Sequence, residues 1–130
     1  MTRAFLDTYV LLYMLSGDTA KADKADALLL EGGVISVQVL NEFAHVARRK
    51  FKAPWDAVWT GLAAIKANVD IEPITLETHS EGLRIAERYR LSVFDGLLLG
   101  SATLAGCDRF YSEDMQDGQI VGGLRIVNPF

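Results

Sequence analysis

Short apolar runs alternate along the whole chain with longer segments in which apolar residues recur at helical spacing. The short runs predict buried strands at residues 4–6, 34–35, 71–74, 109–112 and 124–127. The longer segments predict helices at residues 7–15, 19–30, 37–51, 54–68, 75–91 and 93–105. Strands separated by helices pair in parallel through crossover connections, so this order predicts an α/β fold with a mostly parallel central sheet.

Length and composition narrow the class of protein further. The 130 residues, half of them apolar and 23% charged, predict one globular domain over residues 1–130. A net charge of −4 excludes a uniformly basic nucleic-acid-binding surface, so any such contact needs a local patch. Cys107 is the single cysteine, which excludes an internal disulfide and a cysteine-based zinc site. The uncharged stretches are too short to span a membrane and no clean signal-peptide cleavage site follows residues 3–15, so we expect a cytoplasmic protein.

Two acidic residues stand alone in apolar surroundings. Asp7 is the only charged residue in 4–17, and Asp95 is the only one in 93–106. An ionised carboxylate in such a setting is costly unless it is hydrogen-bonded, paired or bound to a metal. Asp7 could simply cap a helix, and Ser92 with Asp95 fits a capping box. Capping is compatible with ligand binding, because ligands of open α/β sheets bind where helices begin beyond the strands.

Two further acids occupy similar places. Glu42 lies on the polar side of the helix after the second strand, and Asp114 lies in an acidic loop after a later strand. Taken singly, they could be a solvated surface residue and an ordinary loop residue. In a parallel sheet, however, all four acids would converge at one edge. Clustered carboxylates repel one another, and oxygen-seeking Mg²⁺ relieves that repulsion, whereas His45 and His79 lack metal-ligand spacing to each other.

Four motifs carry a resemblance to a known family. Residues 5–13 (FLDTYVLLY), 36–43 (SVQVLNEF), 94–102 (FDGLLLGSA) and 111–114 (YSED) resemble, in order and spacing, the motifs of PIN-domain proteins. The branch that they resemble most is that of the VapC-like ribonucleases of toxin–antitoxin pairs. The resemblance covers essentially the whole chain. It implies a PIN-like α/β/α sandwich, Mg²⁺- or Mn²⁺-dependent cleavage of RNA, a homodimer and an antitoxin partner.

The resemblance also assigns roles to residues. Asp7, Glu42, Asp95 and Asp114 fall on the family's acidic metal-binding positions. We expect Asp7, Asp95 and Asp114 to hold the metal, and Glu42 to hold a metal-bound water or help to deprotonate the nucleophile. Supporting roles are expected for Thr8, Ser112 and Asp117. One position departs from the family: Tyr9 stands where the first motif usually has asparagine. This departure leaves open an alternative, a PIN-like module that binds RNA or protein without cutting.

An acidic centre repels RNA, so a ribonuclease of this kind needs basic residues at its rim. The densest basic run predicts the RNA-binding residues Arg48, Arg49, Lys50 and Lys52. The same run could instead be a solvated helix end whose cations complement the helix dipole. In the helix at 54–68, Trp55 and Trp59 are either part of the core or part of a dimer or antitoxin surface.

Overall fold

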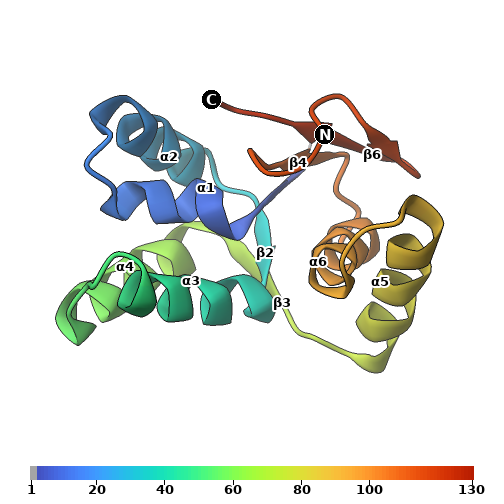
Figure 1. Cartoon of the computed structure of the whole chain (residues 1–130), viewed down its shortest axis with the longest axis horizontal. Coiled ribbons are helices and arrows are strands. Elements are labelled where there is room, and N and C mark those ends of the chain that lie inside the picture. Colours follow the sequence, from blue (N-terminus) through green and yellow to red (C-terminus); the bar gives the residue numbers. More distant parts are fainter. Residues whose placement is uncertain (1–2) are drawn as a thin grey trace.

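A computed structural model describes residues 3–130 and shows a central sheet with helices on both sides (Figure 1). The sheet of the described residues has the order β3-β2-β1-β4-β6-β5. Its strands are β1 (Ala4–Leu6), β2 (Val34–Ser36), β3 (Asp70–Glu72), β4 (Arg109–Tyr111), β5 (Ile120–Val121) and β6 (Leu124–Val127). All neighbours pair in parallel except β5 and β6, which are antiparallel. The predicted mostly parallel sheet is therefore confirmed.

The helices form the two outer layers. They are α1 (Thr8–Leu12), the 3₁₀ turn η1 (Tyr13–Leu15), α2 (Thr19–Glu31), α3 (Val37–Arg49), α4 (Trp55–Asn68), α5 (Leu76–Tyr89) and α6 (Val93–Leu104). Helices α1 to α4 cover one face of the sheet, and α5 and α6 cover the other (Figure 1). This arrangement is the expected α/β/α sandwich. Among residues 3–130, none of the helices combines the length and apolar character that crossing a bilayer requires.

The boundaries differ from prediction in a few places. The predicted helix 7–15 is α1 followed by η1, and the predicted strand 71–74 is the shorter β3. Strand β5 was not predicted, because two residues are too few to show a period. Ser36 occupies the N-cap position of α3, but its hydroxyl makes no capping bond and is buried without a partner among the described residues.

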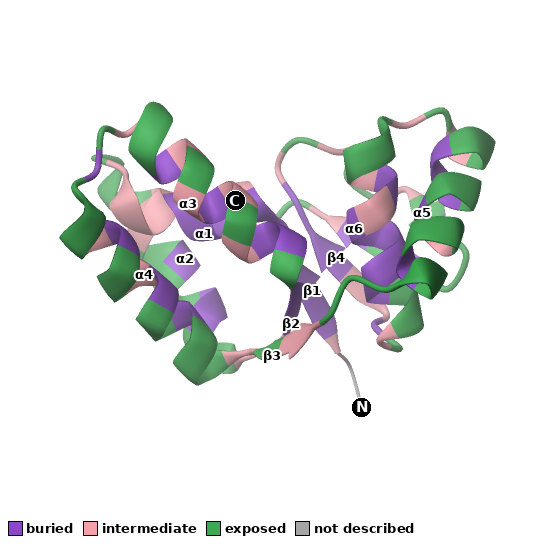
Figure 2. Ribbon diagram, turned by 90° about the horizontal axis from the view of Figure 1, so that it is seen from below, coloured by how far each residue is buried: buried purple, intermediate pink, exposed green. Residues whose placement is uncertain are grey.

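The core is formed where both helical layers meet the central strands. All three residues of β1 and the last two of β4 are buried (Figure 2), and the rings of Phe5 and Phe110 stack with centroids 5.3 Å apart. In α4, Val58, Leu62 and Ile65 are buried, whereas Trp55 and Trp59 are 55% and 61% exposed. The core interpretation of the two tryptophans is therefore wrong.

Helix α6 packs unusually closely against α5. A Cβ atom on Gly96 would lie 2.5 Å from the carbonyl oxygen of Gly82, and one on Gly100 would lie 2.8 Å from the backbone nitrogen of Gly82. Only glycines allow this backbone contact. The centre of α6 is largely buried, whereas Phe94 and Leu104 at its two ends are exposed. The packing holds the first turn of α6, and with it Asp95, at one end of the sheet.

The strand register brings the ends of β1 and β4 together. Leu6 lies opposite Tyr111, and the N–H of Asp7 donates to the carbonyl oxygen of Tyr111 at 3.0 Å. The residues that follow these two strands, Asp7 and Ser112, are consequently neighbours despite their separation in sequence.

Candidate metal-dependent active site

The four acids singled out in the sequence line one cavity of about 440 Å³ at the carboxyl ends of β1 and β4. Asp7 and Asp114 come from segments that follow strands, Asp95 from the start of α6, and Glu42 from α3. The remaining lining residues are Thr8, Tyr9, Asn41, His45, Val46 and Leu98. The predicted convergence at one edge of the sheet is thus present in the fold.

Asp7 is the most buried of the four acids, with 7% of its surface exposed. Its Oδ1 accepts from the N–H of Thr8 at 2.7 Å, and its Oδ2 accepts from the hydroxyl of Ser112 at 2.8 Å. Burial is the largest influence on this carboxyl group and raises its pKa from 3.8 to about 6. The two hydrogen bonds oppose the rise, and the charges of Asp114 and Asp95 add to it. Asp7 therefore caps α1 and also belongs to the acidic cavity.

Ser112 connects Asp7 to the loop that carries Asp114. While its hydroxyl donates to Asp7, its oxygen accepts from the N–H groups of Asp114 at 3.2 Å and Met115 at 3.3 Å. Ser112 is fully buried, and within residues 3–130 these groups satisfy its hydroxyl. Ser112 therefore contacts both the Asp7 carboxylate and the backbone of Asp114, and its supporting role stays a prediction.

Glu42 is half-buried and held by side chains on both of its oxygens. Thr8 donates its hydroxyl to Oε1 at 2.7 Å, and Gln38 Nε2 lies 3.4 Å from Oε2. Gln38 also donates to the carbonyl oxygen of Phe94 at 3.1 Å, which links α3 to the start of α6. Glu42 is thus a partly exposed residue of the cavity wall with two side-chain contacts, and its catalytic role stays a prediction. Gln38 was not predicted, although its position one turn before Glu42 is a usable signal.

Asp95 occupies the first turn of α6. Its N–H donates to the hydroxyl of Ser92 at 3.1 Å, which is one half of the expected capping box; among residues 3–130 the reciprocal bond to the Asp95 carboxylate is not formed. Partial burial is the main cause that raises the pKa of Asp95; the Ser92 bond opposes the rise, and the charge of Asp114 contributes to it. Three carboxylates of the cavity thus influence one another electrostatically.

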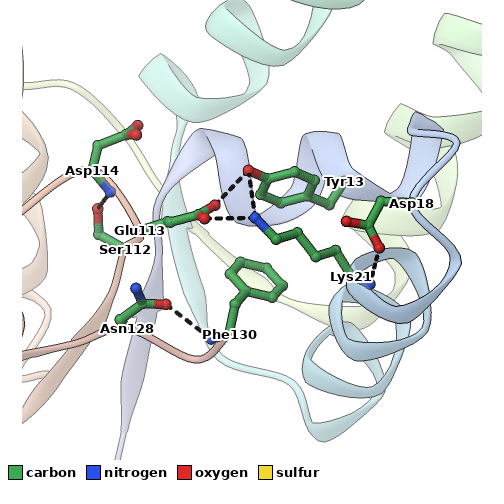
Figure 3. Close-up of polar contacts among 8 residues, drawn as sticks. All are labelled: Tyr13, Asp18, Lys21, Ser112, Glu113, Asp114, Asn128 and Phe130. Carbon is green, nitrogen blue, oxygen red and sulfur yellow. Dashed lines mark hydrogen bonds and ion pairs between the residues drawn. The ribbon is translucent and has the colours of Figure 1, made fainter.

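Two other acids of the same loop lie outside the cavity. Asp117 is exposed, and its Oδ1 accepts from the N–H of Asn128 at 2.8 Å. Glu113 turns towards α2 and η1, where it contacts Lys21 and Tyr13 (Figure 3). Neither residue lines the cavity, so the structure does not place Asp117 with the other predicted site residues.

The basic run lies at the C-terminal end of α3, beside the cavity. Lys50 Nζ is 3.4 Å from the hydroxyl of Tyr9, a cavity residue, and 5.0 Å from the centre of its ring. Arg48 donates to the carbonyl oxygen of Ala53 at 3.0 Å and stacks over Trp55 at 4.9 Å. Arg49 and Lys52 are exposed. Tyr9 therefore connects the acidic cavity to the predicted RNA-binding residues.

The chemistry of the cavity suits a hard divalent cation. All four acids offer oxygen donors, and none of the ion pairs within residues 3–130 neutralises any of them. In the same residues, no three His, Cys, Asp or Glu side chains are gathered closely enough to hold a metal ion as they stand. Clustered carboxylates repel one another, and a divalent cation bound between them offsets that repulsion. The donor set fits Mg²⁺ or Mn²⁺, with Asp7 as its most buried member.

Comparison with known families identifies the fold to which this cavity belongs. The chain matches the PIN domain family over residues 4–116. It belongs to the PIN domain family. Residues 4–116 contain all four cavity acids of this PIN domain. A comparison with curated proteins gives no match.

Several solved structures share the PIN fold of this chain. A chain of a toxin–antitoxin complex from Klebsiella pneumoniae superposes with a TM-score of 0.75 and 19% identity, covering 98% of both chains. A chain of DNA-bound VapBC from Salmonella typhimurium superposes with a TM-score of 0.69 and 17% sequence identity, covering 100% of both chains. VapC20 of Mycobacterium tuberculosis is described as a toxin that cleaves the sarcin–ricin loop. It superposes with a TM-score of 0.67 and 18% sequence identity, covering 85% of this chain and 89% of the VapC20 chain.

Proposed function

We propose that this PIN domain is a Mg²⁺- or Mn²⁺-dependent endoribonuclease and acts as the toxin of a toxin–antitoxin pair. The observation that carries the proposal is the meeting of Asp7, Glu42, Asp95 and Asp114 in one cavity, with no ion-paired cation among residues 3–130 to neutralise them. Membership of the PIN family and the shared fold with VapC20, described as a toxin that cleaves the sarcin–ricin loop, support the assignment.

The residues of the cavity would have different roles in the reaction. Asp7, Asp95 and Asp114 would hold the cation, with Ser112 orienting Asp7 and the Asp114 backbone. A bound divalent cation supplies stabilisation of the charge that builds up on the phosphate and lowers the pKa of water. Glu42, which contacts Thr8 and Gln38, would orient the attacking water and accept its proton.

The rim supplies the attraction for RNA that the acidic centre lacks. The cavity extends along α3 through His45 and Val46 towards the basic run, and Lys50 reaches back to Tyr9 on its wall. We propose that Arg48, Arg49, Lys50 and Lys52 bind phosphates on this side of the cavity. Trp55, exposed and stacked under Arg48, offers a surface for an unpaired base.

The proposed partners are an antitoxin protein and a second copy of the chain. Similar folds occur in the toxin–antitoxin complex from Klebsiella pneumoniae and in VapBC from Salmonella typhimurium, which supports an antitoxin partner. The exposed Trp59 on α4 is available for a protein contact. Light scattering of the purified chain at micromolar concentration should give the mass of a dimer, and a strict monomer would contradict this part of the proposal.

A second candidate function rests on Tyr9. This side chain lines the cavity, where its ring and its bond to Lys50 occupy space that a smaller residue would leave open. A PIN domain altered in this way could bind RNA without cutting it. Cleavage assays separate the two candidates, since only the first requires turnover.

The decisive variant is Asp95→Asn, which keeps the shape of the side chain and removes its charge. We expect RNA cleavage in the presence of Mg²⁺ to fall more than about 100-fold, beyond what the loss of an outer contact to a metal site causes. Asp56→Asn, an exposed first-turn acid of α4, serves as the matched control and should cleave normally. Undiminished cleavage by Asp95→Asn would overturn the nuclease assignment. A wild-type chain that binds RNA without cutting it would favour the second candidate.

A further inference from the structure

A second polar cluster lies just outside the cavity and is formed by residues far apart in the sequence. Lys21 Nζ of α2 is 2.6 Å from Oε1 of Glu113 and 3.3 Å from the hydroxyl of Tyr13 in η1 (Figure 3). The Tyr13 hydroxyl donates to the other carboxylate oxygen of Glu113. Each of the three polar groups therefore contacts both of the others.

Aromatic packing orders this cluster. Lys21 Nζ lies 4.6 Å from the centre of the Tyr13 ring and 5.5 Å from that of Phe130, and the two rings meet edge to face at 4.9 Å. The side chains of Lys21 and Glu113 are only 30% and 27% exposed. An ion pair enclosed in this way has fewer alternative geometries than one on an open surface.

Glu113 stands between the two residues that connect the loop to the cavity. On one side Ser112 binds Asp7 and the N–H of Asp114, and on the other side Asp114 lines the cavity. Figure 3 shows the Glu113 side chain directed at Lys21 and the Asp114 carboxylate on the other side of the loop. The segment 112–114 is thus held from within by Ser112 and from outside by Glu113.

We infer that Lys21 and Tyr13 are positioning residues that act through Glu113 to hold Asp114 at the cavity. The role rests on the proposed function, because it concerns where a cation ligand lies. Two adjacent acids in one loop could each face the cavity, and the contacts of Lys21 and Tyr13 determine that Glu113 faces away. None of the three residues of the cluster lines the cavity, so they affect chemistry only through the loop.

The first test measures the loop itself, in the metal-free protein. Lys21→Met and Glu113→Gln should each speed amide hydrogen exchange at Asp114 and Met115, whose N–H groups bind Ser112. Asp70→Asn, which removes the exposed ion pair of Asp70 with Arg3, is the matched control and should leave these two amides unchanged. Unchanged exchange in both cluster variants would overturn the inference.

The second test measures the cation and the reaction. In Lys21→Met, Mn²⁺ affinity by calorimetry and kcat for RNA cleavage should each fall on the order of tenfold, the lower end for contacts that support a metal ligand. KM should stay unchanged, and Lys21→Arg should restore most of the activity. The double variant with Glu113→Gln should be no worse than either single variant, since both break the same contact.

The outcomes separate the inference from the proposed function. If Lys21→Met raises KM alone, Lys21 is an RNA contact and the positioning role is wrong. If wild type cleaves RNA with Mn²⁺ and Lys21→Met equals it in both affinity and kcat, only the positioning role fails. If the wild type neither binds Mn²⁺ nor cleaves RNA, the proposed function is wrong. The positioning role of Lys21 and Tyr13 is then wrong too, because it concerns a cation ligand, and no result of the amide exchange would rescue it.

Discussion

Replacing Asp7 with asparagine should make the metal-free protein more stable at neutral pH. Asp7 is buried, and at pH 7 its carboxyl group is ionised in the folded chain in spite of that burial. Asparagine has nearly the same shape and no charge to desolvate. The proposed role of Asp7 in holding the cation accounts for a destabilising charge at this position, a trade-off that active-site residues commonly make.

The size of the effect follows from the pKa of Asp7, which burial raises from 3.8 to about 6. Each pKa unit corresponds to about 1.4 kcal/mol, so the charged carboxylate lowers the free energy of unfolding at pH 7 by about 3 kcal/mol. Asparagine accepts the Thr8 bond but cannot accept from Ser112 with the same geometry, which costs about 1 kcal/mol. The expected net gain is about 2 kcal/mol.

The gain should depend on pH in a defined direction. Between the unfolded pKa of 3.8 and the folded pKa of about 6, the folded wild type binds more protons than the unfolded chain. The contribution of Asp7 to the free energy of unfolding of the wild type is therefore fully present below pH 3.8. It is lost as the pH rises through the folded-state pKa of about 6. Asparagine does not titrate, so the difference between variant and wild type should be absent or slightly reversed near pH 4 and constant above pH 7.

Urea unfolding in the presence of a chelator, followed by circular dichroism at several pH values, measures this difference. Asp18→Asn is the matched control, because Asp18 caps α2 by a similar bond but is exposed and should gain nothing. Saturating Mg²⁺ should raise the free energy of unfolding of the wild type but not that of Asp7→Asn, because Asp7 is proposed to hold the cation. This difference links the stability measurement to cation binding. Equal stability of the variant and the wild type at both pH 4 and pH 7 would refute the reasoning.

Two further predictions concern the rim and the helix packing. Charge reversal at Arg48 and Arg49 should weaken RNA binding and flatten its dependence on salt, because fewer counterions are released. Filter binding across a salt series measures both quantities. If neither the affinity nor its salt dependence changed, the proposed RNA-binding role of these residues would be wrong. Gly96→Ala places a Cβ atom 2.5 Å from the carbonyl oxygen of Gly82 and should lower the free energy of unfolding by about 1–3 kcal/mol. Gly17→Ala, the control, has open space around its Cβ position and should cost less. Equal melting temperatures of the two variants would refute this packing argument.

Much of the fold and of the cavity could be predicted because the relevant signals are local. Strand β1 is short and wholly apolar, and Asp7 and Asp95 are isolated charges next to a strand end or a helix start. In a parallel sheet such positions share an edge, so the meeting of the acids follows from topology once the sheet is known. The missed elements lacked such a signal: β5 is two residues long, and the break between α1 and η1 changes no periodicity.

The amino-acid sequence by itself determined the order of strands and helices and the scarcity of charge around Asp7 and Asp95, since both depend on neighbours along the chain. Only the tertiary structure decided which acid of the loop enters the cavity. Asp114 does so and Glu113 does not, because Lys21 and Tyr13 arrive from α2 and η1, some 90 to 100 residues away, and bind Glu113 on the outer side. It likewise decided that Trp55 and Trp59 face outwards, because one helix face can pack against the core and Val58, Leu62 and Ile65 occupy it.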